Sequence, residues 1–101
     1  MIDQLFKFLA NGVVERASGY RPGARHPLMF YAAERSLEAA QQRASDFGGK
    51  KGWAHIEFKR GKEISRDTQL IADETLRSAA EKALQSGVTL VVYSVEIPAD
   101  G

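Results

Sequence analysis

The sequence predicts an α+β domain in which helices lie on one face of a small, mainly antiparallel sheet. Two long segments carry apolar residues at the spacing of an amphipathic helix, and a segment between them alternates apolar and polar residues like a half-buried strand. A segment near the C-terminus is apolar on both faces, which is typical of a strand covered on both sides. The chain of 101 residues fits one domain, 1–101.

The N-terminal quarter is predicted to hold one short helix and one strand. Residues 2–10 indicate a helix that ends at Asn11-Gly12. Residues 13–17 are β-branched in character and are predicted as the first strand, followed by a loop rich in Gly, Pro and Arg over 18–27. Without a strand at 13–17 the sheet would have three strands. The apolar residues that set the helical spacing are Ile2, Leu5, Phe6 and Leu9.

Two longer helices are predicted, over residues 28–47 and 68–86. Pro27 suits the first turn of the earlier helix, and Gly48-Gly49 suits its end. Gly87 follows the later helix in the same way. The apolar stripes are Phe30, Ala33, Leu37, Ala40, Ala44 and Phe47 in the first helix, and Ala72, Leu76, Ala79, Ala80, Ala83 and Leu84 in the second.

The remaining strands are predicted from period-two alternation and from a run that is apolar on both faces. Residues 53–59 alternate, with Ala54, Ile56 and Phe58 on one face. Arg60-Gly61 indicates a tight connection to a short, charged edge strand over 62–65, where lysines oppose pairing with other chains. Residues 88–97 are apolar on both faces and are predicted as the last strand.

Taken in order, these elements give a helix and then β-α-β-β-α-β, the split βαβ pattern of ferredoxin-like folds. The right-handed crossover rule places both long helices on one face of the sheet. The other face is then open, and a helix of nine residues covers only part of it. We therefore expect a homodimer joined at least partly through this open sheet face.

Composition excludes several functional classes. The absence of cysteine rules out disulfides, thiolate zinc sites, iron–sulfur clusters and cysteine nucleophiles, and it suits a reducing cytoplasm. No apolar run approaches the ~18 residues of a membrane span. Metal-ligand spacing, a glycine-rich phosphate loop and an activated nucleophile are also missing. We therefore expect a cytoplasmic protein that binds no metal, cofactor or membrane.

The loop before the first long helix is the leading candidate for a binding site. Backbone N–H groups at a helix N-terminus favour anions, and two arginines with a glycine between them suit a phosphate or carboxylate. Arg21, Arg25 and His26 are the predicted ligand contacts. The main interpretation is a non-catalytic binding or interaction domain that takes a small anionic ligand or a protein partner.

A basic segment supports an alternative, binding of RNA or a nucleic-acid single strand. Residues 50–66 hold six basic residues against two acidic ones, and a tryptophan on which a base could stack. The predicted contacts within 50–62 are Lys50, Lys51, Trp53, Lys59 and Arg60. The competing interpretation is a solvated edge, with Trp53 buried in a subunit contact.

A small enzyme is the remaining alternative. Its site would lie in a cavity between the sheet and its cover and would involve Tyr93, His55 or Trp53. His26 and His55 are the two histidines of the chain, and they lie on different predicted elements. Their spacing gives neither a metal pair nor a catalytic motif, so the sequence leaves open whether the protein is an enzyme.

Overall fold

The computed structural model describes residues 3–98 and contains one four-stranded sheet of order β3-β1-β2-β4. Every strand pairing is antiparallel, so the predicted α+β class with a mainly antiparallel sheet is confirmed. The order β-β-α-β-α-β differs from the predicted ferredoxin-like order. The elements are β1 (Gln4–Val14), β2 (Arg25–Glu34), α1 (Leu37–Lys50), β3 (Trp53–Ile64), the 3-10 turn η1 (Thr68–Leu70), α2 (Glu74–Ser86) and β4 (Val88–Val92).

The helix predicted over residues 2–10 is wrong, because this segment forms β1, with Ile2 outside the described residues. β1 is a central strand between β2 and β3; one of its faces is buried along the strand, and the other is buried at Leu5 and only half-buried from Lys7 onward. Leu5 packs in one apolar cluster of the core, and Phe6 and Phe8 pack in the other. Leu5 and Leu9 stand next to the residues of the buried face, and these apolar neighbours imitate a helical spacing. Of the predicted strand at 13–17, only Val13 and Val14 belong to the sheet, as the end of β1.

The predicted helix over 28–47 divides into a strand and a helix. Residues 28–33 are all buried in β2, the second central strand, which explains their unbroken apolar character. α1 begins only at Leu37, where the hydroxyl of Ser36 accepts a hydrogen bond from the Ala39 N–H at 3.2 Å and caps the helix. Pro27 lies in β2 opposite Asn11, and no helix starts there.

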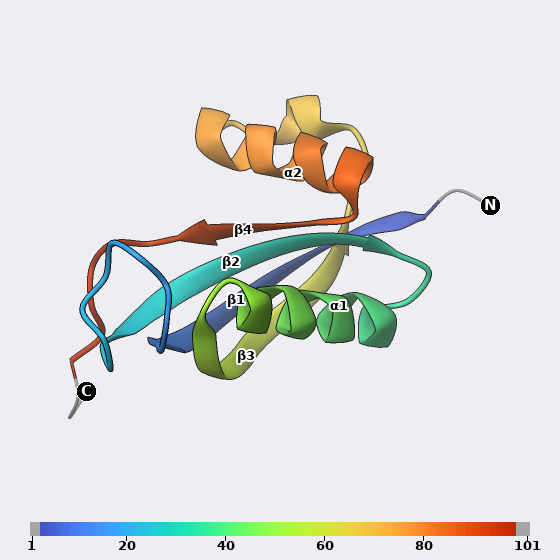
Figure 1. Cartoon of the computed structure of the whole chain (residues 1–101). Coiled ribbons are helices and arrows are strands. Elements are labelled where there is room, and N and C mark those ends of the chain that lie inside the picture. The colour runs from blue at the N-terminus through green and yellow to red at the C-terminus, as the bar shows by residue number, and fades with distance from the viewer. Residues whose placement is uncertain (1–2, 99–101) are drawn as a thin grey trace.

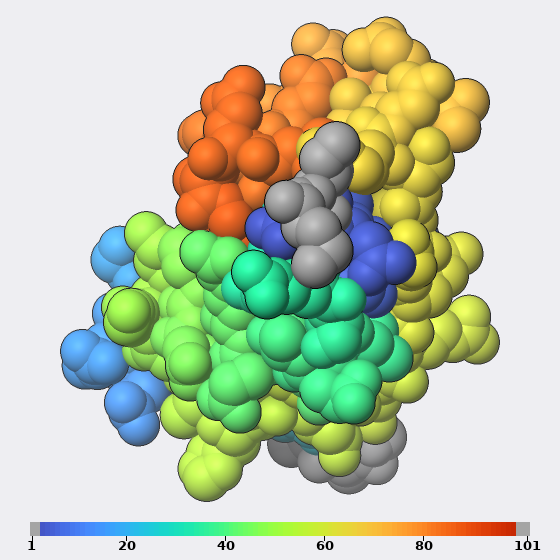
Figure 2. Space-filling view, turned by 90° about the vertical axis from the view of Figure 1, so that its right-hand side faces the viewer, coloured from blue at the N-terminus to red at the C-terminus, as the bar shows by residue number. Residues whose placement is uncertain are grey.

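The two helices lie on opposite faces of the sheet, so the prediction of both on one face is wrong. Ala40 and Ala44 of α1 pack in one core cluster, and Ala80 and Ala83 of α2 pack in the other. Figures 1 and 2 show α1 and α2 as separate layers with strands between them. The crossover rule concerns parallel strands joined by one connection; here α1 joins the parallel strands β2 and β3, whereas α2 joins β3 to β4, which run antiparallel. The open sheet face that motivated a homodimer is thus partly covered by α2.

The third strand is continuous through the predicted turn at Arg60-Gly61. β3 pairs with β1 along its length, with register shifts between Leu9 and Ala10 and between Asn11 and Val13. Gly61 lies opposite Phe8, and a β-carbon there would stand 2.5 Å from the ring. Glycine thus lets the buried ring of Phe8 pack against the strand backbone.

The C-terminal elements are shorter than predicted. α2 begins at Glu74 after Asp73, whose carboxylate accepts a hydrogen bond from the Leu76 N–H at 2.9 Å. β4 ends at Val92, and the chain returns to the sheet only at Ile97, opposite Arg25. Val95, between these points, is 77% exposed.

We predict that Gly61→Ala destabilises the fold by about 1–3 kcal/mol, because the added methyl collides with a fully buried ring. Chemical denaturation would measure the change in the free energy of unfolding. Gly49→Ala is the control: its β-carbon would meet nothing within 4 Å, and in a helix it should stabilise by about 1 kcal/mol. A Gly61→Ala protein as stable as the wild type would contradict the packing of Phe8 on Gly61.

Candidate functional site

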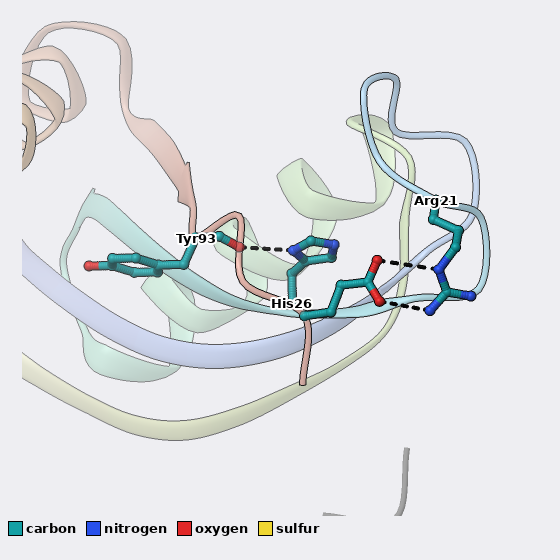
Figure 3. Close-up of polar contacts among 4 residues, drawn as sticks. Arg21, His26 and Tyr93 are labelled. Carbon is teal, nitrogen blue, oxygen red and sulfur yellow. Dashed lines mark hydrogen bonds and ion pairs between the residues drawn. The ribbon is translucent and has the colours of Figure 1, made fainter. Parts of the chain in front are cut away.

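The predicted anion loop connects β1 to β2 and precedes no helix, so the helix N-terminus invoked for it does not exist. The guanidinium of Arg21 donates two hydrogen bonds to the Glu96 carboxylate, at 2.7 and 3.3 Å, and both side chains remain exposed (Figure 3). Arg25 is half-buried and forms no ion pair with the described residues. Arg21 and Arg25 share a surface hollow of about 300 Å³ with Glu96.

The ion pair between Arg21 and Glu96 shifts the pKa of both side chains. The hydrogen bond from Arg21 lowers the pKa of Glu96, and the same contact raises the pKa of Arg21. The loop therefore already holds an anionic group, a carboxylate of its own chain. An external anion at Arg21 would compete with Glu96, and the anion site at Arg21 and Arg25 stays a prediction.

His26 is separated from these arginines by burial. Its side chain is 2% exposed, and Nδ1 lies 2.8 Å from the carbonyl oxygen of Tyr93, so Nδ1 carries the proton and donates it (Figure 3). The ring packs against Tyr20 and Trp53, with centroids 4.9 and 5.7 Å away. Nε2 is buried and has no hydrogen-bond partner among the described residues. His26 acts as a core residue that attaches the chain after β4 to the sheet.

The residues predicted for nucleic-acid binding are divided between two places. Trp53 is 4% exposed and packs in the core, so it offers no surface for a base. Lys51 lies over the ring of Phe47 at 5.2 Å, near Trp53. Lys59 is six residues after Trp53 along β3, about 20 Å for an extended strand, and its ammonium pairs with Glu57 at 2.6 Å. Lys50 is adjacent in sequence to Lys51, and Arg60 is adjacent to Lys59.

The residues predicted for an enzyme do not converge. His55 is exposed on β3 with φ of 49°, Trp53 is buried on the α1 side, and Tyr93 is 39% exposed beyond β4. Within residues 3–98 no group of three or more His, Asp and Glu side chains could hold a metal ion. No helix in the same range is long and apolar enough to cross a membrane.

A hollow of about 530 Å³ runs along the free edge of β4 between the two helices. We call it the β4 groove. One wall comes from α1 and the residues after it, and the other comes from α2. Its lining includes Phe47, Lys51, Ser78, Lys82, Leu90 and Val92. The lining combines apolar groups with two lysines and, among the described residues, contains no carboxylate.

The β4 groove exposes unpaired backbone. The N–H of Tyr93 donates to Pro27, and the carbonyl of Gly87 accepts from Ala33, so the odd-numbered residues of this strand bond to β2. In an antiparallel sheet, the backbone N–H and C=O groups of successive residues point alternately to the two sides of a strand. Those of the even-numbered residues therefore point away from β2. These residues are Val88, Leu90 and Val92.

The two edges of the sheet differ in their protection. β3 carries charged side chains and two register shifts, which are devices that oppose pairing with another chain. β4 contains three valines, a threonine and a leucine, with no charge and no proline. From the sequence, Lys51 and Trp53 of the groove are predicted to bind nucleic acid, and Lys82 is not singled out. The lysines of β3 indicate an edge, but no local signal marks β4 as one, because strand order is set by long-range pairing.

A search of protein-family models finds no match to this chain, and no curated protein or solved structure matches it.

We predict that Arg21→Gln raises the pKa of Glu96 toward the ordinary value of a glutamate. In the wild type this pKa is lower in the folded state. The pair therefore stabilises the fold above the ordinary glutamate pKa, and this contribution is lost as pH falls through the folded-state pKa. A carbon-detected NMR titration of the side-chain carboxyls would measure both states. Glu57, whose pKa Lys59 lowers, is the internal control and should not change. An unchanged Glu96 titration would contradict the pairing.

Proposed function

We propose that this chain is a protein-interaction domain that binds an acidic, extended segment of a partner protein by adding it as a strand to β4. One observation carries the proposal. The unprotected edge of β4 lies at the base of a groove whose described lining includes two lysines and no carboxylate. Strand addition at an exposed sheet edge is a common mode of peptide recognition.

The backbone of β4 favours an extended ligand. Val88, Leu90 and Val92 offer outward N–H and C=O groups at every second residue, the spacing at which a neighbouring strand bonds. Satisfying these groups from another chain gives affinity that depends little on sequence. A helical ligand satisfies its own backbone and gains nothing from this edge.

The walls of the groove favour an acidic ligand. Lys51 lies at the wall next to α1, and Lys82 at the wall formed by α2, so an extended segment passes between two ammonium groups. Neither lysine forms an ion pair with any residue between 3 and 98. A second copy of this chain would bring its own lysines to the same contact, and like charges would oppose it. Charge therefore supports a foreign acidic segment over self-association through β4.

The aromatic end of the groove supports a preference at one position of the ligand. Phe47 and Tyr20 line this part of the groove, and the buried ring of Trp53 packs against Tyr20 with 5.5 Å between centroids. Side chains of an added strand alternate between the two faces, so one of them points toward these rings. An apolar side chain at that position would be shielded from water by the rings.

The test is an NMR titration with synthetic peptides. The probe is an acetylated heptapeptide of alternating valine and threonine with glutamate at both ends; the comparison peptide carries lysine at both ends. We expect the acidic peptide to bind at least about tenfold more tightly, because it meets the two lysines. Amide shift changes should concentrate on β4 and on both walls of the groove. A version with proline at the centre should bind more weakly, because proline cannot donate to the edge.

Matched variants locate the interaction. Lys51→Gln with Lys82→Gln should remove most of the preference for acidic peptides, whereas Lys59→Gln, on the opposite edge, should leave it unchanged. Equal affinity for the two peptides, or shift changes away from β4, would refute the proposal. So would wild-type protein that dimerises through β4 at the concentrations of the titration.

A further inference from the structure

Three basic side chains surround a second hollow, on the α2 face of the sheet but beyond the reach of that helix. Lys7 of β1 and Arg60 and Lys62 of β3 line a cavity of about 250 Å³ together with Leu9 and Gly61. Lys7 lies directly opposite Lys62, and Arg60 lies opposite Leu9, so all three cations point to one side. Side chains placed this way lie about 5 Å apart across strands and about 7–8 Å apart on the diagonal.

Mutual repulsion of the three cations lowers the stability of the fold. Protection of the sheet edge against pairing with other chains explains only two of them. Like charges directly opposite in a sheet repel each other, and none of the three cations has an ion pair within the described chain. Arg60 and Lys62 lie on an edge strand, where cations oppose aggregation. Lys7 lies on the central strand β1, where that reason does not apply. A ligand of opposite charge would turn this repulsion into binding.

An adjoining hollow of about 420 Å³ shares Lys7 and Lys62 and combines apolar side chains with Glu63, Ser65 and Asp67. Tyr31, Lys7 and Lys62 form one row across β2, β1 and β3, so the apolar and basic parts are continuous. The apolar lining includes Tyr31, Ile64, Leu70, Ile71 and Leu76. Leu70 is 72% exposed, so part of its apolar surface is open to a ligand.

Two carboxylates, those of Glu63 and Asp67, line the adjoining hollow and not the basic one. Glu63 accepts a hydrogen bond from the Gln4 side chain at 3.1 Å, and Asp67 accepts one from the Gln69 N–H at 3.2 Å. On β3, Glu57 is paired with Lys59. The described lining of the basic hollow contains no carboxylate, so its three cations keep their charge available for a ligand.

From this geometry we infer a binding site for an organic phosphate. The phosphate lies among Lys7, Arg60 and Lys62, and its apolar body lies in the adjoining hollow against Tyr31 and Leu70. The guanidinium supplies a planar pair of donors, and the ammonium groups supply point charges, a combination suited to a phosphomonoester. The inference is independent of the proposed function, because these residues lie away from the β4 groove.

Isothermal titration calorimetry with 1-naphthyl phosphate tests the site, in about 10 mM salt so that screening is weak. We expect binding at least about tenfold tighter than that of inorganic phosphate, because the naphthyl ring fills the apolar hollow. Lys7→Gln, Arg60→Gln and Lys62→Gln should each weaken it about tenfold. Lys59→Gln is the matched control on the same strand, where the ammonium is already paired, and it should change nothing. Lys62→Gln should also melt no lower than wild type, because the substitution removes a repulsion.

Two further arms identify the source of the phosphate. Binding to phosphatidylcholine vesicles that contain phosphatidic acid, lost in Lys62→Gln, would assign the phosphate to a lipid headgroup. Binding to naphthyl phosphate without vesicle binding would assign it to a soluble ligand. The inference is overturned if naphthyl phosphate binds no more tightly than inorganic phosphate, or if Lys59→Gln weakens binding as much as Lys62→Gln. Tighter binding of oligothymidylate than of naphthyl phosphate would also overturn it.

Discussion

The central strand β2 is apolar on both faces, and the rest of the structure depends on covering them. Leu28 to Ala33 are buried without interruption, with alternate side chains directed into opposite core clusters. A sheet with two apolar faces requires a layer on each. α1 supplies one layer and α2 the other, so the chain after β3 crosses the width of the sheet before it forms β4 at the far edge.

The same constraint creates the two candidate binding surfaces. α2, a helix of thirteen residues, packs mainly on β4 and β2, and its backbone does not approach β3 in the described structure. The part of this sheet face formed by β1 and β3 therefore stays partly open. The basic hollow lies on that part. At the other edge, α1 and α2 stand on either side of β4 and form the walls of a groove. One edge is long, charged and irregular, and the other is short and uncharged, so only the second is suited to strand addition.

The connection between β1 and β2, together with the start of β2, holds the chain segment after β4 in place. His26 donates a hydrogen bond to Tyr93, the carbonyl of Arg25 accepts one from Ile97, and Arg21 pairs with Glu96. These contacts attach the chain after β4 to the start of β2. Arginine, glycine and histidine in a loop are typical of anion sites, but here their nearest partners belong to the same chain.

The sequence by itself determined the elements whose signals are local. Residues 37–47 carry the stripe of α1, residues 74–86 that of α2, and residues 53–58 the alternation of β3, and all three are present. Tertiary structure decided the identity of residues 28–34, because a strand covered on both faces has no period that separates it from a helix. It also decided that of residues 4–10, where apolar neighbours such as Leu5 and Phe6 imitate a helical spacing. It further decided that β4 is an edge and which cations meet. Lys7 and Lys62 are 55 positions apart in sequence and directly opposed only because β1 pairs with β3 in this register.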